Sequence, residues 1–408
     1  MLFSGMSATA EPRPIQAGPP EVKDARSSSA HAEFDLLAAF CASTWRSAEV
    51  GCESLVRSGV NWKKLLRTAE HHGLTSVLLE RLEVSSEYVP RETQDALRSA
   101  YRQNASRALW FAHELGRIVE SLRSAGVEAL AHKGPALSAM LYGDATQRQF
   151  RDLDFLVRPD DVNKTTTVLA GMGYECGVDL GPLEEKANLH SGYEYVFHSS
   201  HGQNLLEVQW RILPRFYAID FDMKELFARS QEIKLGSQVC RTLSGEDLLL
   251  ALCVHAAKHV WTQMSWLRDI TRLAQTYELN WGFIEREAAQ VGIQRIVAMN
   301  FLLADQLFRC GLPARFGKWL DDRATRALVP KVLEIMQRSV PYETESFAYF
   351  RLMLRLRERR RDRARLLWRL AMTPGIGEWK SVRLPRLLFP MYSLVRVGRL
   401  AKRLIFEI

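Results

Sequence analysis

The sequence predicts an α+β protein in which helical domains at the N- and C-terminal sides flank one small mixed sheet. Apolar residues fall at helical spacing from about 33 to 123 and again after about 244. Between these stretches, short runs such as FRDLDFLV and LLEVQW have the apolar content and the alternation of strands. A chain of 408 residues with 47% hydrophobic content is long enough for two or three domains and can fill their cores.

The first helical domain is expected over 33–123, with helices in FDLLAAFCAS, WKKLLRTAEHHG, TSVLLERLE and TQDALRSAYRQNASRALWFAHELGRIVESLRSAG. Gly59, Gly73 and Gly126 stand near the expected helix ends. Residues 1–32 are rich in Pro, Gly, Ser and Ala and lack both a basic start and a long apolar run. We expect a disordered leader there rather than a signal peptide.

The sheet is expected within a core at 124–230. VEALAHK predicts a strand, GPALSAMLYG a short helix with Pro135 in its first turn, FRDLDFLVRP a second strand, and PDDVNKTTTVLAGMG a second helix. YEYVFHSS and LLEVQWRI predict two strands that meet at a turn over 201–204. The expected order is β-α-β-α-β-β-β.

Helical periodicity then returns in GEDLLLALCVHAAKHVWTQMSWLRDITRLAQTYE, within a helical domain expected over 231–345. The last segment, 346–408, is expected to be helical, amphipathic and basic, broken by prolines 374, 385 and 390. No apolar run is long enough to span a bilayer.

The positive charge of the chain is concentrated at its C-terminal end. Residues 351–408 hold 16 Lys and Arg against 4 Asp and Glu, a local charge of +12, so the total of +8 leaves −4 for the preceding 350 residues. Such a run is usually a solvated helix face with stacked arginine stems. The functional alternatives are an anionic membrane surface or a nucleic acid as partner.

The cysteines are scattered, without C-x-x-C pairs, at Cys41, Cys52, Cys176, Cys240, Cys253 and Cys310. This spacing favours free thiols in a reducing compartment over a disulfide scaffold. We therefore expect a cytoplasmic protein. Its basic C-terminal segment could attach it peripherally to a membrane.

Two carboxylates, Asp152 and Asp154, stand one residue apart in an expected strand. Residues i and i+2 of a strand point the same way, so both share one face while Leu153 and Phe155 share the other. One interpretation is an exposed face with solvated aspartates. The other is a Mg²⁺ site, with Mn²⁺ as the alternative ion, because hard cations bind carboxylate oxygens and would relieve the repulsion. Glu207, on a later strand, would supply a third carboxylate.

Phosphate-binding candidates lie next to these carboxylates. Gly134 opens a helix whose free N–H groups form an anion site, with Lys133 beside it. Arg148 and Arg151 stand just before the aspartates. Together these groups suit attack on the α-phosphorus of a triphosphate, in which catalysis depends on positioning and charge stabilisation. The sequence has no G-x-x-x-x-G-K-[ST] loop. The structural alternatives are a solvated Lys133 and an Arg151 that simply pairs with an aspartate.

The ordered motifs K-G-P-A-L-x-x-x-L-Y-G, R-x-x-x-D-L-D-F-L-V-R-P, L-x-x-M-G-Y, L-E-V-Q-W-R and H-A-A-K-H-x-W-x-x-M-S-W-L-x-D-I resemble the uncharacterised nucleotidyltransferase family of the polymerase-β-like superfamily. The resemblance covers roughly 35–400, including the closing L-P-R-L-L-F-P-M-Y-S-L-V-R. It implies a nucleotidyltransferase core with Asp152 and Asp154 as metal ligands and Glu207 as the third carboxylate. NTP is the implied substrate, and the acceptor is unassigned.

Two departures from the superfamily and family patterns affect this interpretation. Lys133-Gly134 replaces the Gly-Ser phosphate signature of the superfamily. Gln209 stands where members of the family often have histidine, and it cannot titrate. A catalytically silent nucleotide-binding or scaffolding protein is therefore the alternative to an active transferase, and binding of nucleic acid through the basic C-terminus is the second alternative.

His255 and His259 are four residues apart, with Trp266 and Asp269 expected to continue their stripe. The segment from His255 to His259 lacks the glutamate of the H-E-x-x-H zinc motif, which disfavours a zinc site. We expect a polar stripe that faces the catalytic cleft, in which Gln209, His255, His259 and Asp269 are candidate substrate contacts. Histidines packed and hydrogen-bonded in a helical core are an equal alternative.

Overall fold

A computed structural model describes residues 31–42, 59–84, 89–199, 205–236, 238–313, 316–340, 342–343, 346–382 and 384–406. The helices before the sheet are α1 (Ala32–Phe40), α3 (Trp62–His71), α4 (Thr75–Val84) and α5 (Arg91–Ser124). The sheet region contains β1 (Ala129–Ala131), α6 (Gly134–Tyr142), β2 (Asp152–Val157), α7 (Val162–Gly171), β3 (Tyr174–Cys176), α8 (Pro182–Ser191), β4 (Glu194–Ser199), β5 (Leu205–Gln209), α9 (Met223–Ala228), β6 (Gln231–Leu235) and β7 (Gln238–Thr242).

The helices after the sheet are α10 (Gly245–Lys258), α11 (Met264–Thr276), α12 (Trp281–Val291), α13 (Gln294–Phe308), α14 (Gly317–Leu320), α15 (Arg323–Arg326), α16 (Val329–Gln337), α17 (Phe347–Arg355), α18 (Arg360–Met372), α19 (Ile376–Ser381), the 3₁₀ helix η7 (Arg386–Met391) and α20 (Tyr392–Phe406). The fold is therefore α+β, with helical regions on both sides of the sheet in the sequence, as predicted.

The strands form one mixed sheet in the order β3-β4-β5-β2-β1-β7-β6. β2 lies near its centre, antiparallel to β1 and parallel to β5. Both edges of β2 are thus hydrogen-bonded, and its side chains from Leu153 to Val157 are buried. Asp154 is buried and Asp152 is partly buried, so neither is an exposed surface residue.

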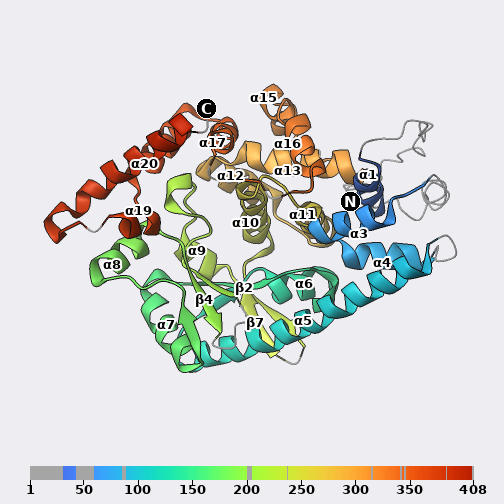
Figure 1. Cartoon of the computed structure of the whole chain (residues 1–408), viewed down its shortest axis with the longest axis horizontal. Helices are drawn as coiled ribbons and strands as arrows, with labels where there is room; N and C mark the ends of the chain where they lie inside the picture. Colours follow the sequence, from blue (N-terminus) through green and yellow to red (C-terminus); the bar gives the residue numbers. More distant parts are fainter. Residues whose placement is uncertain are drawn as a thin grey trace, which may run out of the picture.

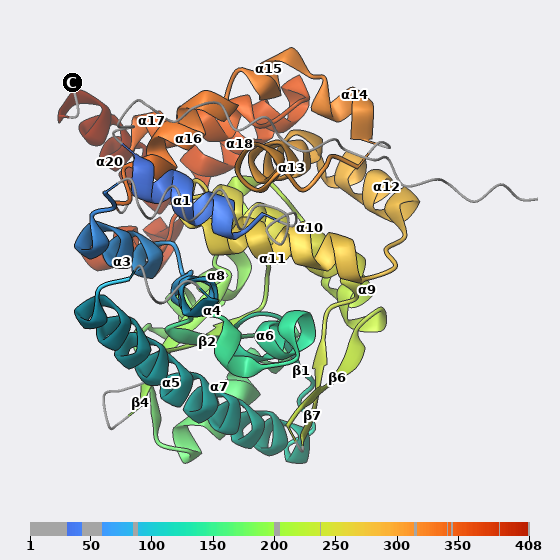
Figure 2. The same ribbon diagram turned by 90° about the vertical axis from the view of Figure 1, so that its right-hand side faces the viewer.

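The two faces of the sheet pack against different helices (Figure 1, Figure 2). On one face, Leu153, Phe155 and Val157 join a core with residues of α5 and α7. On the other face, Leu156 packs into the larger core, to which α10, α11 and α13 contribute. The parity predicted from the sequence is confirmed: Asp152 and Asp154 share the face that looks toward α10 and α11.

The sheet is larger than the sequence predicts. Residues 231–242, expected to be helical, form β6 and β7, an antiparallel hairpin whose second strand pairs with β1. These strands are short, and half or more of their side chains are exposed or only partly buried, so their apolar periodicity is weak. The structure also inserts α8 between β3 and β4, where the predicted order has no helix.

The helix predicted across 245–278 is broken in the structure. α10 ends at Lys258, and Val260 and Trp261 adopt positive φ angles of 54° and 51° before α11 begins at Met264. Left-handed residues without a glycine carry a steric cost. Burial of the Trp261 side chain, whose indole N–H donates to Asn300 Oδ1 at 2.8 Å, offsets that cost.

The predictions for the leader, the turn at 201–204, the cysteines and membrane-spanning helices can be compared with the structure only where it describes these residues. The expected leader, 1–32, and the turn at 201–204 lie outside the described residues, except for the last two residues of the leader. Cys52 also lies outside them, and the five remaining cysteines are unpaired. Among the helices of the described segments, none combines the length and apolar content needed to cross a bilayer.

Candidate active site

Three carboxylates converge on one face of the sheet. The parallel pairing of β2 with β5 sets Asp154 opposite Glu207, and Asp152 projects from the same face two residues earlier. Each of the three offers an oxygen, and these oxygens lie within 4.8 Å of one another. Within the described residues, no other set of three such side chains converges in this way.

Lys133 and Gln209 hold the carboxylates in place. Lys133 Nζ lies 2.8 Å from Asp154 Oδ1. Gln209 Nε2 donates to the same oxygen at 2.9 Å and to Glu207 Oε2 at 3.0 Å. Gln209 thus bridges two carboxylates, a role that requires a donor and that an ionised carboxylate at this position could not perform.

The three carboxyl groups differ in proton affinity because of burial and of one neighbouring ammonium. Burial alone would raise the pKa of Asp154, but the Lys133 ammonium and hydrogen bonds hold it at about 2. Burial and the Asp154 charge raise the pKa of Asp152 to about 6. Burial and the same charge raise the pKa of Glu207 to about 9. Without a cation, the site therefore resists carrying three negative charges.

These donors fit a hard divalent cation. All three ligands are carboxylates, and the set contains no thiolate or imidazole of the kind that favours zinc. A bound cation would balance the repulsion that raises the pKa values of Asp152 and Glu207. Mg²⁺ and Mn²⁺ match this chemistry.

The N-terminus of α6 lies beside the carboxylates. Lys133 is its N-cap, and Gly134, its first residue, has a φ of 56° and lines the same cavity as Asp152. The left-handed conformation explains the glycine. Arg148 reaches this end of α6, because its Nη1 lies 3.4 Å from the Gly134 carbonyl oxygen.

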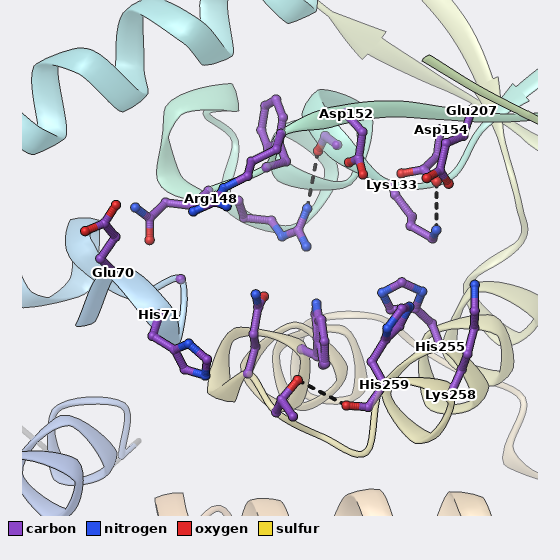
Figure 3. A pocket seen from close by; sticks show the side chains of 18 of the residues that line it. Glu70, His71, Lys133, Arg148, Asp152, Asp154, Glu207, His255, Lys258 and His259 are labelled. Atoms are coloured by element: carbon purple, nitrogen blue, oxygen red, sulfur yellow. Dashed lines mark hydrogen bonds and ion pairs between the residues drawn. The ribbon is translucent and has the colours of Figure 1, made fainter. Parts of the chain in front are cut away.

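The carboxylates face a cavity of about 690 Å³ (Figure 3). Its sheet-side wall carries Lys133, Gly134, Arg148, Arg151 and the three carboxylates. The opposite wall carries residues of α10 and of the turn after it. The cavity thus has one wall with carboxylates and basic residues and an opposite wall with histidines and one lysine.

Lys258 is the charged residue of the opposite wall that the sequence analysis missed. Its Nζ lies 2.8 Å from the hydroxyl oxygen of Tyr193 and 4.6 Å from the centre of that ring. Within the described part of the chain, its ammonium forms no ion pair with a carboxylate at 4.0 Å or less. Burial lowers its pKa although Glu194 and Glu207 raise it. Lys258 is therefore a buried lysine at the cavity wall that can pair with an anion bound in the cavity.

His255, His259 and Trp266 form one ring cluster on the same wall. Their ring centroids lie 4.7 to 5.4 Å apart. Burial, together with Lys133 and Lys258, lowers the pKa of His255 far below its usual range and that of His259 to about 3. Both rings are thus neutral at physiological pH and can stack or hydrogen-bond as uncharged groups.

Asp269 does not continue this stripe. It is buried on α11, where its Oδ2 lies 2.8 Å from both Nε and Nη2 of Arg148, and its Oδ1 accepts from the Tyr142 hydroxyl at 2.8 Å. The break between α10 and α11 rotates it away from the histidines. Asp269 supports Arg148, and it lies outside the cavity wall formed by the described residues.

Several other cavity residues escaped the sequence analysis. On the sheet side these are Tyr193 and Glu194; at the far end, α3 contributes Glu70 and His71, and α5 contributes Asn104 and Arg107. Of these residues, only Glu194 could have been predicted from the sequence. It alternates with Val196 and His198 in β4, and its pairing with Gln209 of β5 places it on the carboxylate face.

Comparison with known proteins agrees with these residues. The model of a family described as an uncharacterised nucleotidyltransferase matches residues 58–309, a span that contains the sheet and the cavity-lining residues other than Tyr342. No curated protein matches the chain. Because the match covers more than half of the sequence, the chain belongs to this uncharacterised nucleotidyltransferase family.

Proposed function

We propose that the protein is a Mg²⁺-dependent nucleotidyltransferase with a polymerase-β-like core, which transfers a nucleoside monophosphate from an NTP to the hydroxyl of a small molecule, a peptide or a protein. The observation that carries the proposal is the convergence of Asp152, Asp154 and Glu207 on a cavity that also exposes basic groups. The nucleotidyltransferase family of the chain supports the class of reaction.

In the proposed reaction, the acceptor oxygen bonds to the α-phosphorus of the NTP, and the bond from that phosphorus to the bridging oxygen breaks. Pyrophosphate leaves with the electron pair of that bond. Asp152, Asp154 and Glu207 would hold the cation, which supplies charge neutralisation at the reacting phosphate. Once the cation balances the charge of Asp154, Glu207 is ionised and would also accept the proton of the attacking hydroxyl.

Basic groups from both walls would hold the phosphates. The N-terminus of α6 at Gly134, with Lys133, Arg148 and Arg151, serves the sheet side. Lys258 approaches from the helical side, and its buried ammonium gains an anionic partner when a triphosphate enters. Cations on two sides would orient the leaving pyrophosphate and stabilise the charge that develops on it.

Two measurements test the proposal. The melting temperature should rise when an NTP and Mg²⁺ are added together, and by less when either is added alone. An α-labelled NTP should then transfer its label to a component of a cell extract. Binding without transfer for every NTP and extract would favour the alternative, a silent nucleotide-binding scaffold. The absence of both would contradict the proposal.

A further inference from the structure

The C-terminal helix α20 has the reverse of the usual polarity of a surface helix. Arg396 and Arg399 point inward, where their Nη1 atoms lie 3.2 and 2.6 Å from the carboxylate oxygens of Glu378, a buried residue of α19. Arg396 Nε also donates to the Leu370 carbonyl of α18. Tyr392, on the same side of α20, is buried as well. Two of the basic residues of this helix therefore lie on its packed side, whereas Lys402 is exposed.

The apolar side of the same segment faces outward. Leu387 is 93% exposed, Leu394 is 65% exposed, and Met391 and Val397 are each exposed by more than two fifths. These four exposed residues follow one another in the 3₁₀ helix η7 and in the first two turns of α20. We call them the outer stripe. Figure 1 shows α20 along the outer edge of the molecule, with α19 beside it.

The neighbouring helix α18 also exposes basic and aromatic side chains. α18 packs against α20. Arg361, Arg365, Trp368 and Met372 of α18 recur at intervals of four, three and four and are all exposed, Trp368 by 66%. This part of the chain carries 16 basic against 4 acidic residues. Exposed apolar side chains in a strongly basic segment that also exposes a tryptophan fit the boundary between lipid headgroups and acyl chains.

We propose that the outer stripe docks the protein on an anionic lipid bilayer, with α20 lying in the plane of the interface. The proposal is independent of the nucleotidyltransferase reaction. A second copy of the chain fits less well, because a symmetric contact through the same patch would bring two strongly basic surfaces together. A nucleic acid would use the arginines but would leave the leucines and the methionine without an apolar partner.

The test uses the full-length protein and flotation of vesicles. The protein should float with vesicles of phosphatidylcholine and phosphatidylglycerol, should float much less with phosphatidylcholine alone, and should be released in part by high salt. Leu387→Glu with Leu394→Glu should lower the bound fraction roughly tenfold. Leu109→Glu, at a 59% exposed position on α5, is the matched control and should bind as the wild type does.

Other outcomes overturn the proposal. Failure of the wild type to bind anionic vesicles would do so, and so would equal binding by the double variant. Loss of a dimer in the double variant, without vesicle binding, would assign the stripe to a second copy. Salt-sensitive RNA binding that ignores Leu387 and Leu394, again without vesicle binding, would assign the basic surface to nucleic acid. If the double variant does not fold, Leu387→Asp alone replaces it, because this side chain is almost fully exposed.

Discussion

Asp154 on β2 and Glu207 on β5 occupy paired positions of two parallel strands, and Gln209 donates a hydrogen bond to both carboxylates. Paired positions of neighbouring strands project from the same face, so the sheet itself forces these side chains together. With Asp152 added, and with Lys133 the one cation within 4.0 Å of these carboxylates among the described residues, the cluster is costly without a metal. Because the carboxylates share this cost unequally, substitutions at Asp152 and Asp154 should change the stability of the metal-free protein differently.

Asp152→Asn and Asp154→Asn should change the stability of the metal-free protein in opposite directions. The pKa of Asp152 is raised from 3.8 to about 6, so its ionisation costs stability as pH rises through that range. Asp152→Asn should therefore raise the melting temperature at neutral pH. The pKa of Asp154 is lowered to about 2, so its ionised form stabilises the fold, and Asp154→Asn should lower the melting temperature.

Both variants should lose the function of the metal site. Each amide removes one ligand charge, so the affinity for Mg²⁺-NTP should fall at least about tenfold and transfer should be abolished. Thermal unfolding with and without Mg²⁺-NTP measures both effects. Equal stability shifts in the two variants, with full stabilisation by Mg²⁺-NTP retained, would show two solvated aspartates and no metal site.

Lys258→Met should raise the melting temperature of the free protein and weaken NTP binding. Burial lowers the pKa of Lys258, so its charged form costs stability in the fold. The same charge would attract the phosphates, and its loss should lower NTP affinity roughly tenfold while affinity for the nucleoside stays constant. Calorimetric titration of both ligands measures the difference, with Lys234→Met on an exposed part of β6 as the control. A purely structural Lys258 would show lower stability and unchanged NTP affinity.

Asp269→Asn should destabilise the protein by about 3 kcal/mol, because it leaves the buried Arg148 guanidinium without its counter-charge. Asp321→Asn removes a partner of Arg326 from an exposed ion pair and should cost less than about 1 kcal/mol. Urea unfolding of both variants provides the comparison. If the two substitutions cost the same, the Arg148 pair does not support this part of the cavity wall.

His72 should make the protein lose stability as pH falls below about 6.5. Burial lowers the pKa of His72 from 6.5 to about 3, so the unfolded chain takes up a proton over a range in which the folded chain does not. In the fold, His72 Nδ1 accepts from the Met264 N–H at 3.3 Å, and its Nε2 lies 3.1 Å from Ser339 Oγ. Protonation at Nδ1 would remove that acceptor.

His72→Asn keeps an acceptor for the Met264 N–H but cannot titrate. The variant should therefore be less stable than the wild type at neutral pH and should lose less stability on going to about pH 5. Thermal unfolding across this range checks the difference. A slope identical to that of the wild type would show that His72 is not held neutral in the fold.

The sequence predicted the carboxylate-bearing face of the sheet because that face depends on local periodicity. Alternation in FRDLDFLV was enough to orient Asp152 and Asp154, and the strand-Lys-Gly-helix order was enough to place Lys133 beside them. The role of Lys258 could not be predicted, because it depends on how α10 docks over the sheet. The break after α10 uses left-handed Val260 and Trp261, neither of which is a helix-breaking residue type.

The outer stripe shows a related limit. The mixture of leucines and arginines near the C-terminus predicts an amphipathic helix but leaves open which side packs. Glu378 decides this, because one buried carboxylate on a separate helix draws Arg396 and Arg399 inward. A choice that rests on two tertiary ion pairs to one carboxylate leaves no periodic signal in the sequence.

Transfer from NTPs labelled at the α- or the γ-phosphate tests the central claim most directly. Wild-type protein with Mg²⁺ and cell extract should label an acceptor only from the α-labelled NTP, and chelation of Mg²⁺ or Asp154→Asn should abolish the product. Label that arrives from the γ-phosphate would indicate phosphoryl transfer. That result, or transfer by Asp154→Asn at the wild-type rate, would contradict nucleotidyl transfer by the carboxylates of β2 and β5.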